Sequence, residues 1–376
     1  MSAPTTSPAS IPPSDSGSGF EVMRRQDPAS DERRAQILAA PGFGRFFTDH
    51  LARATWTTDG GWHATRVEAY APISLDPSAA VLHYAQEIFE GMKAYRHADG
   101  SVWAFRPTAN AARFARSAHR LALPELPQDL FLSSLEALVR TDADWVPSGG
   151  EASLYLRPFM FASEAFLGVR PASEVTYMVI ASPAGSYFPG GVKPVSIWLS
   201  QEYTRAAAGG TGAAKCGGNY AASLKAQAEA SAHGCDQVCF LDAADHRWVE
   251  ELGGMNLFFV RDDGSVVTPA LTGTILEGIT RDSVMTLLQD MGHEVSEERV
   301  DVADWRAGVS CGRIREIFAC GTAAVITPVG RLVEPGAEHV TADGETGTVT
   351  SAIRTALLDL QYGRTDDTHG WLHRLA

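Results

Sequence analysis

The sequence has little of what marks membrane proteins, nucleic-acid-binding proteins or disulfide-bonded frameworks. No apolar run approaches the roughly 20 residues that a membrane-spanning helix needs, which excludes a transmembrane protein. Lysine and arginine together number 31, against 45 aspartate and glutamate residues, and the net charge of −14 opposes binding to phosphate backbones. With 376 residues, 45% of them hydrophobic and 20% charged, the composition is typical of a globular enzyme with no membrane or nucleic-acid partner.

Cysteine is also scarce, and its spacing fits neither a disulfide framework nor a metal site. The five cysteines are an odd number, all in the C-terminal half of the chain. No Cys-x-x-Cys or His-Glu-x-x-His motif occurs, and Cys235 with Cys239 lacks a second pair of ligands. We therefore expect free thiols in a reducing, cytoplasmic environment and no bound metal.

The length of the chain predicts two domains rather than one. Residues 1–30 are rich in Ser, Pro, Thr and Ala, lack the apolar stretch of a secretory signal, and are expected to form a flexible tail. A segment rich in proline and glycine, 184–194, separates two strand-like runs and predicts an interdomain linker. The expected organisation is a smaller N-terminal domain at 31–183 and a larger C-terminal domain at 195–376.

Strand-like and helical segments alternate, so the fold class is mixed α and β. Two Asp-Gly pairs, Asp99-Gly100 and Asp263-Gly264, stand between strand-like runs and predict β-hairpins. The remaining predicted elements are strands at 175–181 and 237–241 and helices at about 221–232, 278–290 and 348–360.

The segment from Gly209 to Tyr220 places a single lysine, Lys215, among small residues on both sides. Glycine permits close approach of a flat ligand, and a lysine among apolar neighbours loses proton affinity, so its amine can attack an aldehyde. Two phosphate-binding motifs fail here, because Ala214 and Cys216 break a Walker loop and Lys215 takes the third glycine of GxGxxG. The alternative is a solvated lysine on a flexible surface loop.

A second segment runs from Glu251 through Asn256 and Thr268 to Gly278 and Arg281. Together with the lysine segment, it resembles the class IV aminotransferases, the fold type IV family of pyridoxal-phosphate enzymes. Within that family the sequence is similar to branched-chain amino acid aminotransferases, on the runs 84–95, 154–158 and 321–323. The matches extend from about Phe43 to Trp371.

The resemblance implies a two-domain fold with the active site between the domains and the cofactor, pyridoxal 5'-phosphate, in the larger one. It makes Lys215 the Schiff-base lysine, which anchors the cofactor and then moves the Cα proton. Glu251 would pair with the pyridinium nitrogen, and Tyr220 would bond the ring oxygen. The implied phosphate ligands are one arginine and main-chain amides: Arg113, Thr274, Ile275 and Thr322.

Other interpretations of these residues remain open from the sequence. Glu251 can be a surface glutamate, or half of an exposed acidic pair with Glu250, and Tyr220 can simply pack in the core. Arg113, Arg116 and Arg120 share one helix face by their spacing. The family pattern selects Arg113 as the phosphate ligand and leaves the other two as solvated or structural.

For the substrate, the resemblance implies an apolar pocket, which suits the side chains of leucine, isoleucine and valine. Its walls would be aromatic: Phe43, Tyr84, Phe89, Tyr155 and Tyr187. The amides of Thr322 and Ala323 would receive the α-carboxylate, and Arg157 would accommodate the charged side chain of L-glutamate. Taken singly, each aromatic residue can equally belong to the core, and Arg157 can form a structural ion pair.

The expected reaction is a ping-pong transfer of the amino group of L-leucine, L-isoleucine or L-valine to 2-oxoglutarate, and the reverse. A homodimer in which a partner loop completes the pocket is also implied. A D-amino acid aminotransferase, the lyase of folate synthesis and a non-catalytic cofactor-binding protein are the alternatives. Ala324 and Thr327 stand where some relatives carry a redox cysteine pair, so no thiol switch of that kind is expected.

Overall fold

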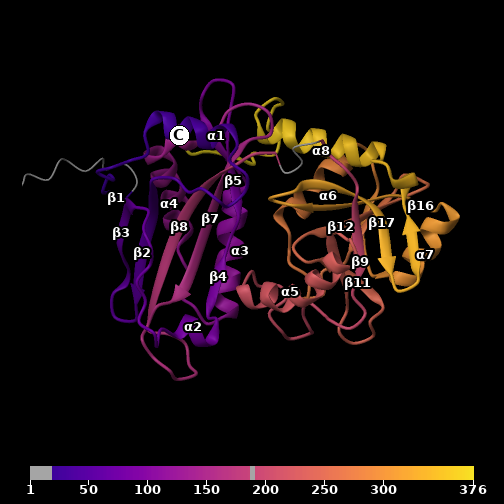
Figure 1. Cartoon of the computed structure of the whole chain (residues 1–376), viewed down its shortest axis with the longest axis horizontal. Helices are drawn as coiled ribbons and strands as arrows, with labels where there is room; N and C mark the ends of the chain where they lie inside the picture. The colour runs from indigo at the N-terminus through magenta and orange to yellow at the C-terminus, as the bar shows by residue number, and fades with distance from the viewer. Residues whose placement is uncertain (1–18, 187–190) are drawn as a thin grey trace, which may run out of the picture.

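The computed structural model describes residues 19–186 and 191–376, which form two β-sheets with helices packed against them (Figure 1). The N-terminal half supplies β1 Glu21–Val22, α1 Asp31–Ala39, β2 His50–Thr57, β3 Gly61–Ala69, α2 Ala80–Tyr84, β4 Glu87–Phe89, β5 Met92–Arg96, β6 Val102–Phe105, α3 Pro107–Arg120, α4 Gln128–Thr141, the 3-10 turn Ala143–Trp145, β7 Ser153–Ala162 and β8 Glu174–Ala184.

The C-terminal half supplies a second set of elements. These are β9 Val195–Leu199, α5 Gly217–Ala232, β10 Gln237–Leu241, β11 Trp248–Leu252, β12 Asn256–Arg261, β13 Val266–Pro269, α6 Ile279–Asp290, β14 Val295–Glu298, β15 Val300–Asp301, α7 Val302–Cys311, β16 Ile314–Gly321, β17 Val325–Glu334, β18 Ala337–Val340, the 3-10 turn Ala342–Gly344, α8 Thr348–Gln361 and β19 Leu372–Arg374. None of the helices in the described part of the chain is long and apolar enough to cross a membrane.

The first sheet runs in the order β1-β3-β2-β8-β7-β5-β6-β19, with β4 paired to β7, and α3 and α4 cover one of its faces. Pro107 begins α3, where a missing N–H costs no helical hydrogen bond. Phe114 of α3, Phe131 of α4 and Tyr177 of β8 pack ring against ring, with centroids 5.5 to 6.4 Å apart. This aromatic contact anchors the helices and thereby fixes the position of α3 beside the site described below.

The second sheet runs in the order β14-β13-β12-β16-β17-β9-β10-β11-β15, with β18 paired to β17. Helices α6 and α8 pack around Phe258 and Phe318, and the opposite face packs on Trp305 of α7. Asp301 caps α7 by accepting from the N–H of Ala303. The sheet is therefore buried on both faces, which matches the uninterrupted apolar runs of its central strands.

The local predictions agree closely with these elements. Both Asp-Gly hairpins are confirmed, as the antiparallel pairs β5–β6 and β12–β13. The strand at 237–241 is confirmed without shift, and the helices near 278–290 and 348–360 are confirmed within one residue. Helix α5 begins at Gly217, four residues before the predicted start, because the glycines and Asn219 continue the helix directly from the lysine loop.

Part of the predicted N-terminal tail is structured, which corrects that prediction. Phe20 is only 3% exposed and belongs to the main core cluster, while Glu21 and Val22 pair with Arg66 and Val67 of β3. Backbone hydrogen bonds, such as the one from the N–H of Met23 to the Val67 carbonyl (2.8 Å), attach this segment to the sheet as well. Residues 1–18 lie outside the described part of the chain.

The two sheets divide at the predicted linker, since β8 ends at Ala184 and β9 begins at Val195. The chain end is an exception: β19 pairs with β6, so the last residues return to the first sheet (Figure 1). The division into domains at 183 and 195 stays a prediction.

Candidate active site

Lys215 lies in the loop before α5, where the two halves of the molecule meet. Its N–H donates to the Ser117 hydroxyl of α3 (2.9 Å), and its carbonyl accepts from the N–H of Phe89 on β4 (3.0 Å). Its amine donates to the Tyr220 hydroxyl (2.8 Å). Burial, with the charge of Arg113 adding to it, lowers the pKa of Lys215 to about 8. The side chain is therefore not a solvated surface lysine.

Tyr220 occupies the first turn of α5, so its phenol returns to the lysine five residues earlier. Its ring lies 4.9 Å from that of Phe89, centroid to centroid. Burial and the nearby Glu251 carboxylate raise the pKa of Tyr220 to about 12. The phenol thus keeps its proton at neutral pH and remains a hydrogen-bond donor.

Glu251 lies on β11 and is 2% exposed. Its Oε1 pairs with the guanidinium of Arg205 (2.9 Å) and accepts from the N–H of Leu276 (2.8 Å), while no hydrogen bond within the described residues reaches Oε2. Burial raises the pKa of Glu251 to about 7, against the opposing charge of Arg205. Glu251 and Glu250 are both buried, so the alternative of an exposed acidic pair is wrong.

The three arginines of α3 have different environments. Arg113 is buried, forms a bidentate ion pair with Glu90 (2.8 Å to each oxygen) and donates to the Glu277 carbonyl (3.0 Å). Arg116 pairs with the Glu277 carboxylate at the surface, and Arg120 donates to loop carbonyls at the surface. The charge of Arg113 helps to lower the pKa of Lys215.

The lysine loop and the loop containing Thr274 and Ile275 approach each other unusually closely. A Cβ at Gly212 would lie 2.3 Å from the Thr274 carbonyl oxygen, so only glycine fits there. Arg205 donates to the carbonyls of Gly212 (3.2 Å) and Thr274 (2.9 Å) and so joins the two loops. Ile275 is buried and lies four residues before α6.

Thr322 and Ala323 form the turn between β16 and β17. The amine of Lys93, on β5, donates to the Ala323 carbonyl (2.9 Å) and ties this turn to the first sheet. Burial lowers the pKa of Lys93 to about 8, with Glu151 opposing. A residue of the first sheet thus holds a turn of the second sheet in place.

Three of the predicted substrate residues form one cluster around Arg157. Its guanidinium lies 4.8 Å from the Phe89 ring centroid and donates to the Tyr155 hydroxyl (3.1 Å). Phe43, though 49% exposed, packs edge-on against Tyr155 at 5.0 Å. A Cβ at Gly91 would lie 2.1 Å from the Tyr155 hydroxyl, so that glycine leaves room for the phenol.

One predicted substrate residue that the structure describes, Tyr84, lies outside this cluster. Tyr84 is 41% exposed, and its hydroxyl donates to the Leu167 carbonyl. Tyr187 lies outside the described residues. Their assignment as pocket walls stays a prediction.

Sequence reasoning missed three charged residues that hold the site together. Arg205 pairs with Glu251, Glu90 pairs with Arg113, and Lys93 holds the Ala323 carbonyl. Glu90 and Lys93 stand within the run 84–95 that carried the resemblance, which was the available signal. Arg205 has no motif of its own. No cluster of three or more metal-ligating side chains occurs in the part of the chain that the structure describes.

Comparisons with known proteins agree with this geometry. The family model of Amino-transferase class IV matches residues 87–332. The probable branched-chain-amino-acid aminotransferase of Streptomyces coelicolor is 61% identical over 95% of this chain and 99% of its own.

Solved structures give the same result. The branched-chain amino acid aminotransferase of Escherichia coli is 28% identical, with a TM-score of 0.71 over 86% of this chain and 100% of its own. The branched-chain amino acid aminotransferase of Thermobaculum terrenum, in its PLP-bound holo-form, is 25% identical, with a TM-score of 0.69 over 86% of this chain and 98% of its own. The chain belongs to the class IV aminotransferases, in the group formed by the branched-chain-amino-acid aminotransferases.

Proposed function

We propose that the protein transfers the amino group of L-leucine, L-isoleucine or L-valine to 2-oxoglutarate, and back, with pyridoxal 5'-phosphate held on Lys215. The observation that carries the proposal is the amine of Lys215, whose proton affinity is lowered by burial and which lies 2.8 Å from the Tyr220 hydroxyl. Such an amine is suited both to attack an aldehyde and to move a proton.

The residues around Lys215 fit each part of the cofactor. Glu251 offers a buried carboxylate with Oε2 unused, which suits a protonated ring nitrogen. Tyr220 offers a protonated phenol for the ring oxygen. Arg113 and the amides of Thr274, Ile275 and Thr322 are the predicted phosphate ligands. When bound, the cofactor supplies an aldehyde carbon that takes up the amino nitrogen and a ring that accepts electrons from the substrate Cα.

The chain's own residues then direct the proton transfers. With its amine free, Lys215 would remove the proton from the substrate Cα and give it to the cofactor carbon that has taken up the amino nitrogen, rather than back to the substrate. Tyr220 orients the lysine amine through its hydrogen bond. Arg205 holds Glu251 by Oε1, which favours a negative charge at Oε2 and so keeps a proton on the ring nitrogen.

The substrate pocket is assigned to the Arg157 cluster. Phe89, Tyr155 and Phe43 supply apolar surface for a branched side chain, and the amides of Thr322 and Ala323 receive the α-carboxylate. Arg157 accommodates the second carboxylate of glutamate by a charge-assisted hydrogen bond. Within a ping-pong cycle one pocket must accept both side chains, and the reaction either completes the synthesis of these amino acids or begins their degradation.

A homodimer is part of the proposal. Leu167 is 61% exposed and Val169 is 87% exposed, in a segment that accepts a hydrogen bond from Tyr84. Exposed apolar side chains grouped in this way indicate an interaction surface. A monodisperse monomer that remains fully active on dilution would contradict the dimer.

The cytoplasm is the proposed location. All five cysteines are free in the structure, as expected in a reducing compartment.

The test is substrate selection by the purified holoenzyme. L-Leucine and D-alanine are each supplied with 2-oxoglutarate, and L- and D-glutamate are measured. We expect L-glutamate from L-leucine and no product from D-alanine. D-Glutamate formed from D-alanine alone would agree with the family but overturn the proposed substrate. The absence of turnover in both mixtures would overturn the proposed aminotransferase activity.

A further inference from the structure

A second cavity lies behind the proposed active site, on the other face of β11. Successive side chains of a strand point to opposite faces, so Glu251 faces the Lys215 side while Glu250 lines this cavity. The cavity measures about 440 Å³, within the size range of small-molecule sites. Its apolar lining is an alanine wall, together with the larger side chains of Val249 and Ile275. The alanines are Ala207, Ala208, Ala243, Ala244 and Ala270.

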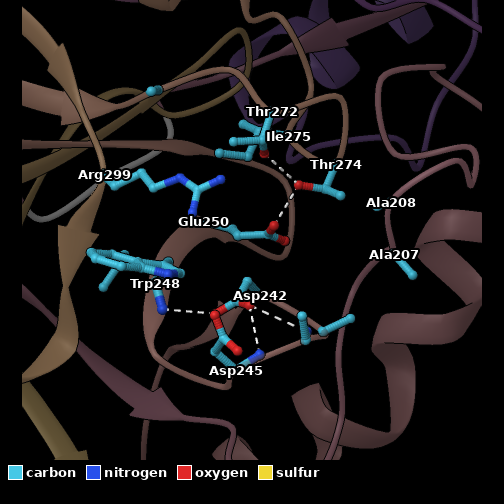
Figure 2. A pocket seen from close by; sticks show the side chains of 14 residues that line it. Ala207, Ala208, Asp242, Asp245, Trp248, Glu250, Thr272, Thr274, Ile275 and Arg299 are labelled. Carbon is cyan, nitrogen blue, oxygen red and sulfur yellow. Dashed lines mark hydrogen bonds between the residues drawn. The ribbon is translucent and has the colours of Figure 1, made fainter.

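Glu250 is a buried carboxylate that lines the cavity (Figure 2). It is 4% exposed, and its Oε1 accepts from the Thr274 hydroxyl. Its Oε2 is buried and has no hydrogen-bond partner within the described residues. A buried acceptor left without a donor is costly, so a ligand toward which the Glu250 carboxylate turns, and which donates to Oε2, would gain affinity from this site.

Arg299 and Trp248 form the rim. Figure 2 shows the side chains of Arg299 and Glu250 extending into the cavity. The Arg299 guanidinium lies 5.6 Å from the Trp248 ring centroid, and no hydrogen bond or ion pair to it occurs among residues 19–186 and 191–376. Asp242 also lines the cavity, but four backbone N–H groups already occupy its carboxylate. Asp245 is exposed at the rim and adds negative charge.

We propose that this cavity binds a small zwitterion, an α-amino acid with an apolar side chain. Its ammonium group donates to Oε2 of Glu250, its carboxylate pairs with Arg299, and its side chain lies on the alanine wall and Trp248. A purely cationic ligand would meet Arg299 without a partner for it, and a purely anionic ligand would meet the carboxylate of Glu250. The two ends of the cavity therefore select a molecule that carries both charges.

An occupant of this cavity has a direct route to the cofactor site. Glu250 holds the hydroxyl of Thr274, whose loop carries the predicted phosphate amides. This consequence rests on the proposed function, whereas binding itself does not. The ligand is therefore expected to change the affinity of the protein for its cofactor.

The experiment uses 1-aminocyclopentane-1-carboxylate, an apolar amino acid without a hydrogen on Cα, which the enzyme cannot transaminate. Binding to the holoenzyme, with its cofactor fixed to Lys215 by borohydride, is measured by calorimetry. Cyclopentylamine and cyclopentanecarboxylate serve as probes with one charge each. We expect the zwitterion alone to bind, and equal binding of either single-charge probe would overturn the two-ended recognition.

Variants locate the binding event. Arg299→Met removes the exposed cation, and Ala208→Phe fills the cavity from its rim. Each is expected to weaken binding by about tenfold or more, whereas Arg313→Met, an exposed arginine elsewhere, leaves it unchanged. Undiminished binding in both cavity variants, or no binding by the wild type, overturns the proposal. Turnover of L-leucine is measured separately, so a failed second site and a failed aminotransferase give different results.

Discussion

Glu250 and Glu251 are neighbours on one strand, and both are buried, yet their surroundings differ. Glu251 forms an ion pair with Arg205 and accepts from a backbone N–H. Glu250 accepts from the Thr274 hydroxyl, is influenced by the charge of Arg205 without an ion pair to it among the described residues, and keeps Oε2 without a partner there. Burial raises the pKa of each carboxyl, to about 7 for Glu251. Each carboxylate keeps one oxygen without a donor among the described residues, but Glu251 is fixed by a charged partner and a backbone N–H, and Glu250 by a single hydroxyl.

Strand β11 contributes one carboxylate to the proposed active site and one to the cavity behind it. Alternation along β11 puts one carboxylate on each face without any extra chain. The residues joined to Glu251 come from distant segments and fix it, as a catalytic geometry requires. Glu250 has neither an ion pair nor a backbone hydrogen bond among the described residues. A binding site that a ligand completes would have such a group.

Replacement of Lys215 by alanine is expected to have the largest effect of the changes considered. The effect should be confined to turnover at the proposed active site, the front face, which carries Lys215 and Glu251. Loss of the residue that anchors the cofactor and moves the proton should reduce turnover of L-leucine by about 1,000-fold or more. Binding of the zwitterionic probe in the rear cavity should persist, because Lys215 does not line it. Steady-state kinetics and calorimetry measure the two effects, and substantial turnover in this variant would refute the assignment.

The matched pair Glu251→Gln and Glu250→Gln tests the comparison directly. A glutamine at 251 can still accept from the N–H of Leu276 through its amide oxygen, and Arg205 keeps its hydrogen bonds to Gly212 and Thr274, so the fold should survive. Loss of the charge opposite the ring nitrogen should lower kcat by about 100-fold. Glu250→Gln should change kcat by less than about threefold. Equal losses in both variants would mean that the two faces are not functionally distinct.

The pKa of Lys215 predicts a pH dependence for cofactor uptake. Only the unprotonated amine attacks the aldehyde, and burial lowers the pKa of this lysine to about 8. Uptake by the cofactor-free protein should therefore rise about tenfold per pH unit below pH 8 and level off above it. With an ordinary lysine, the uptake rate would keep rising to about pH 10.4. Stopped-flow absorbance measures the rate, and a profile still rising steeply at about pH 9.5 would contradict the lowered pKa.

Arg157→Met is expected to separate the two substrates of the front pocket. Without the guanidinium the charged side chain of glutamate loses its partner, so kcat/KM for glutamate should fall by about tenfold or more. The value for L-leucine should fall less, because methionine keeps the apolar contact with Phe89. Half-reactions followed by cofactor absorbance give both values, and equal losses would remove Arg157 from substrate discrimination.

The sequence predicted those elements and site residues whose signal lies in residues close together in the chain. The hairpins followed from Asp-Gly pairs and the β10 strand from a short apolar run. Lys215 and Glu251 were found because their spacing and flanking residues resemble a family pattern. The segment around Phe20 was missed because one buried aromatic residue gives no periodic signal.

The parts of the site that the sequence did not predict depend on contacts between residues far apart in the chain. Lys93 and Ala323 are 230 residues apart in the chain, and Arg205 meets Glu251 only after the loop and the strand have packed together. No local pattern of charge predicts such pairs. The rear cavity was equally hidden, because its walls come from several separate segments and its unpartnered oxygen is defined only in the folded chain.

The smallest predicted effect concerns Thr274, the residue shared by the two faces. Its amide is a predicted phosphate donor, while its hydroxyl donates to Glu250. Thr274→Val keeps the amide and the shape but removes the hydroxyl, so turnover should change by less than about threefold. The free energy of unfolding should fall by about 1–3 kcal/mol, since both oxygens of Glu250 are then buried without donors. Denaturant unfolding measures this loss, and we expect the zwitterionic probe to restore part of it by donating to Glu250. A loss of turnover as large as that of Glu251→Gln would instead place the hydroxyl itself in the catalytic site and erase the distinction between the two faces.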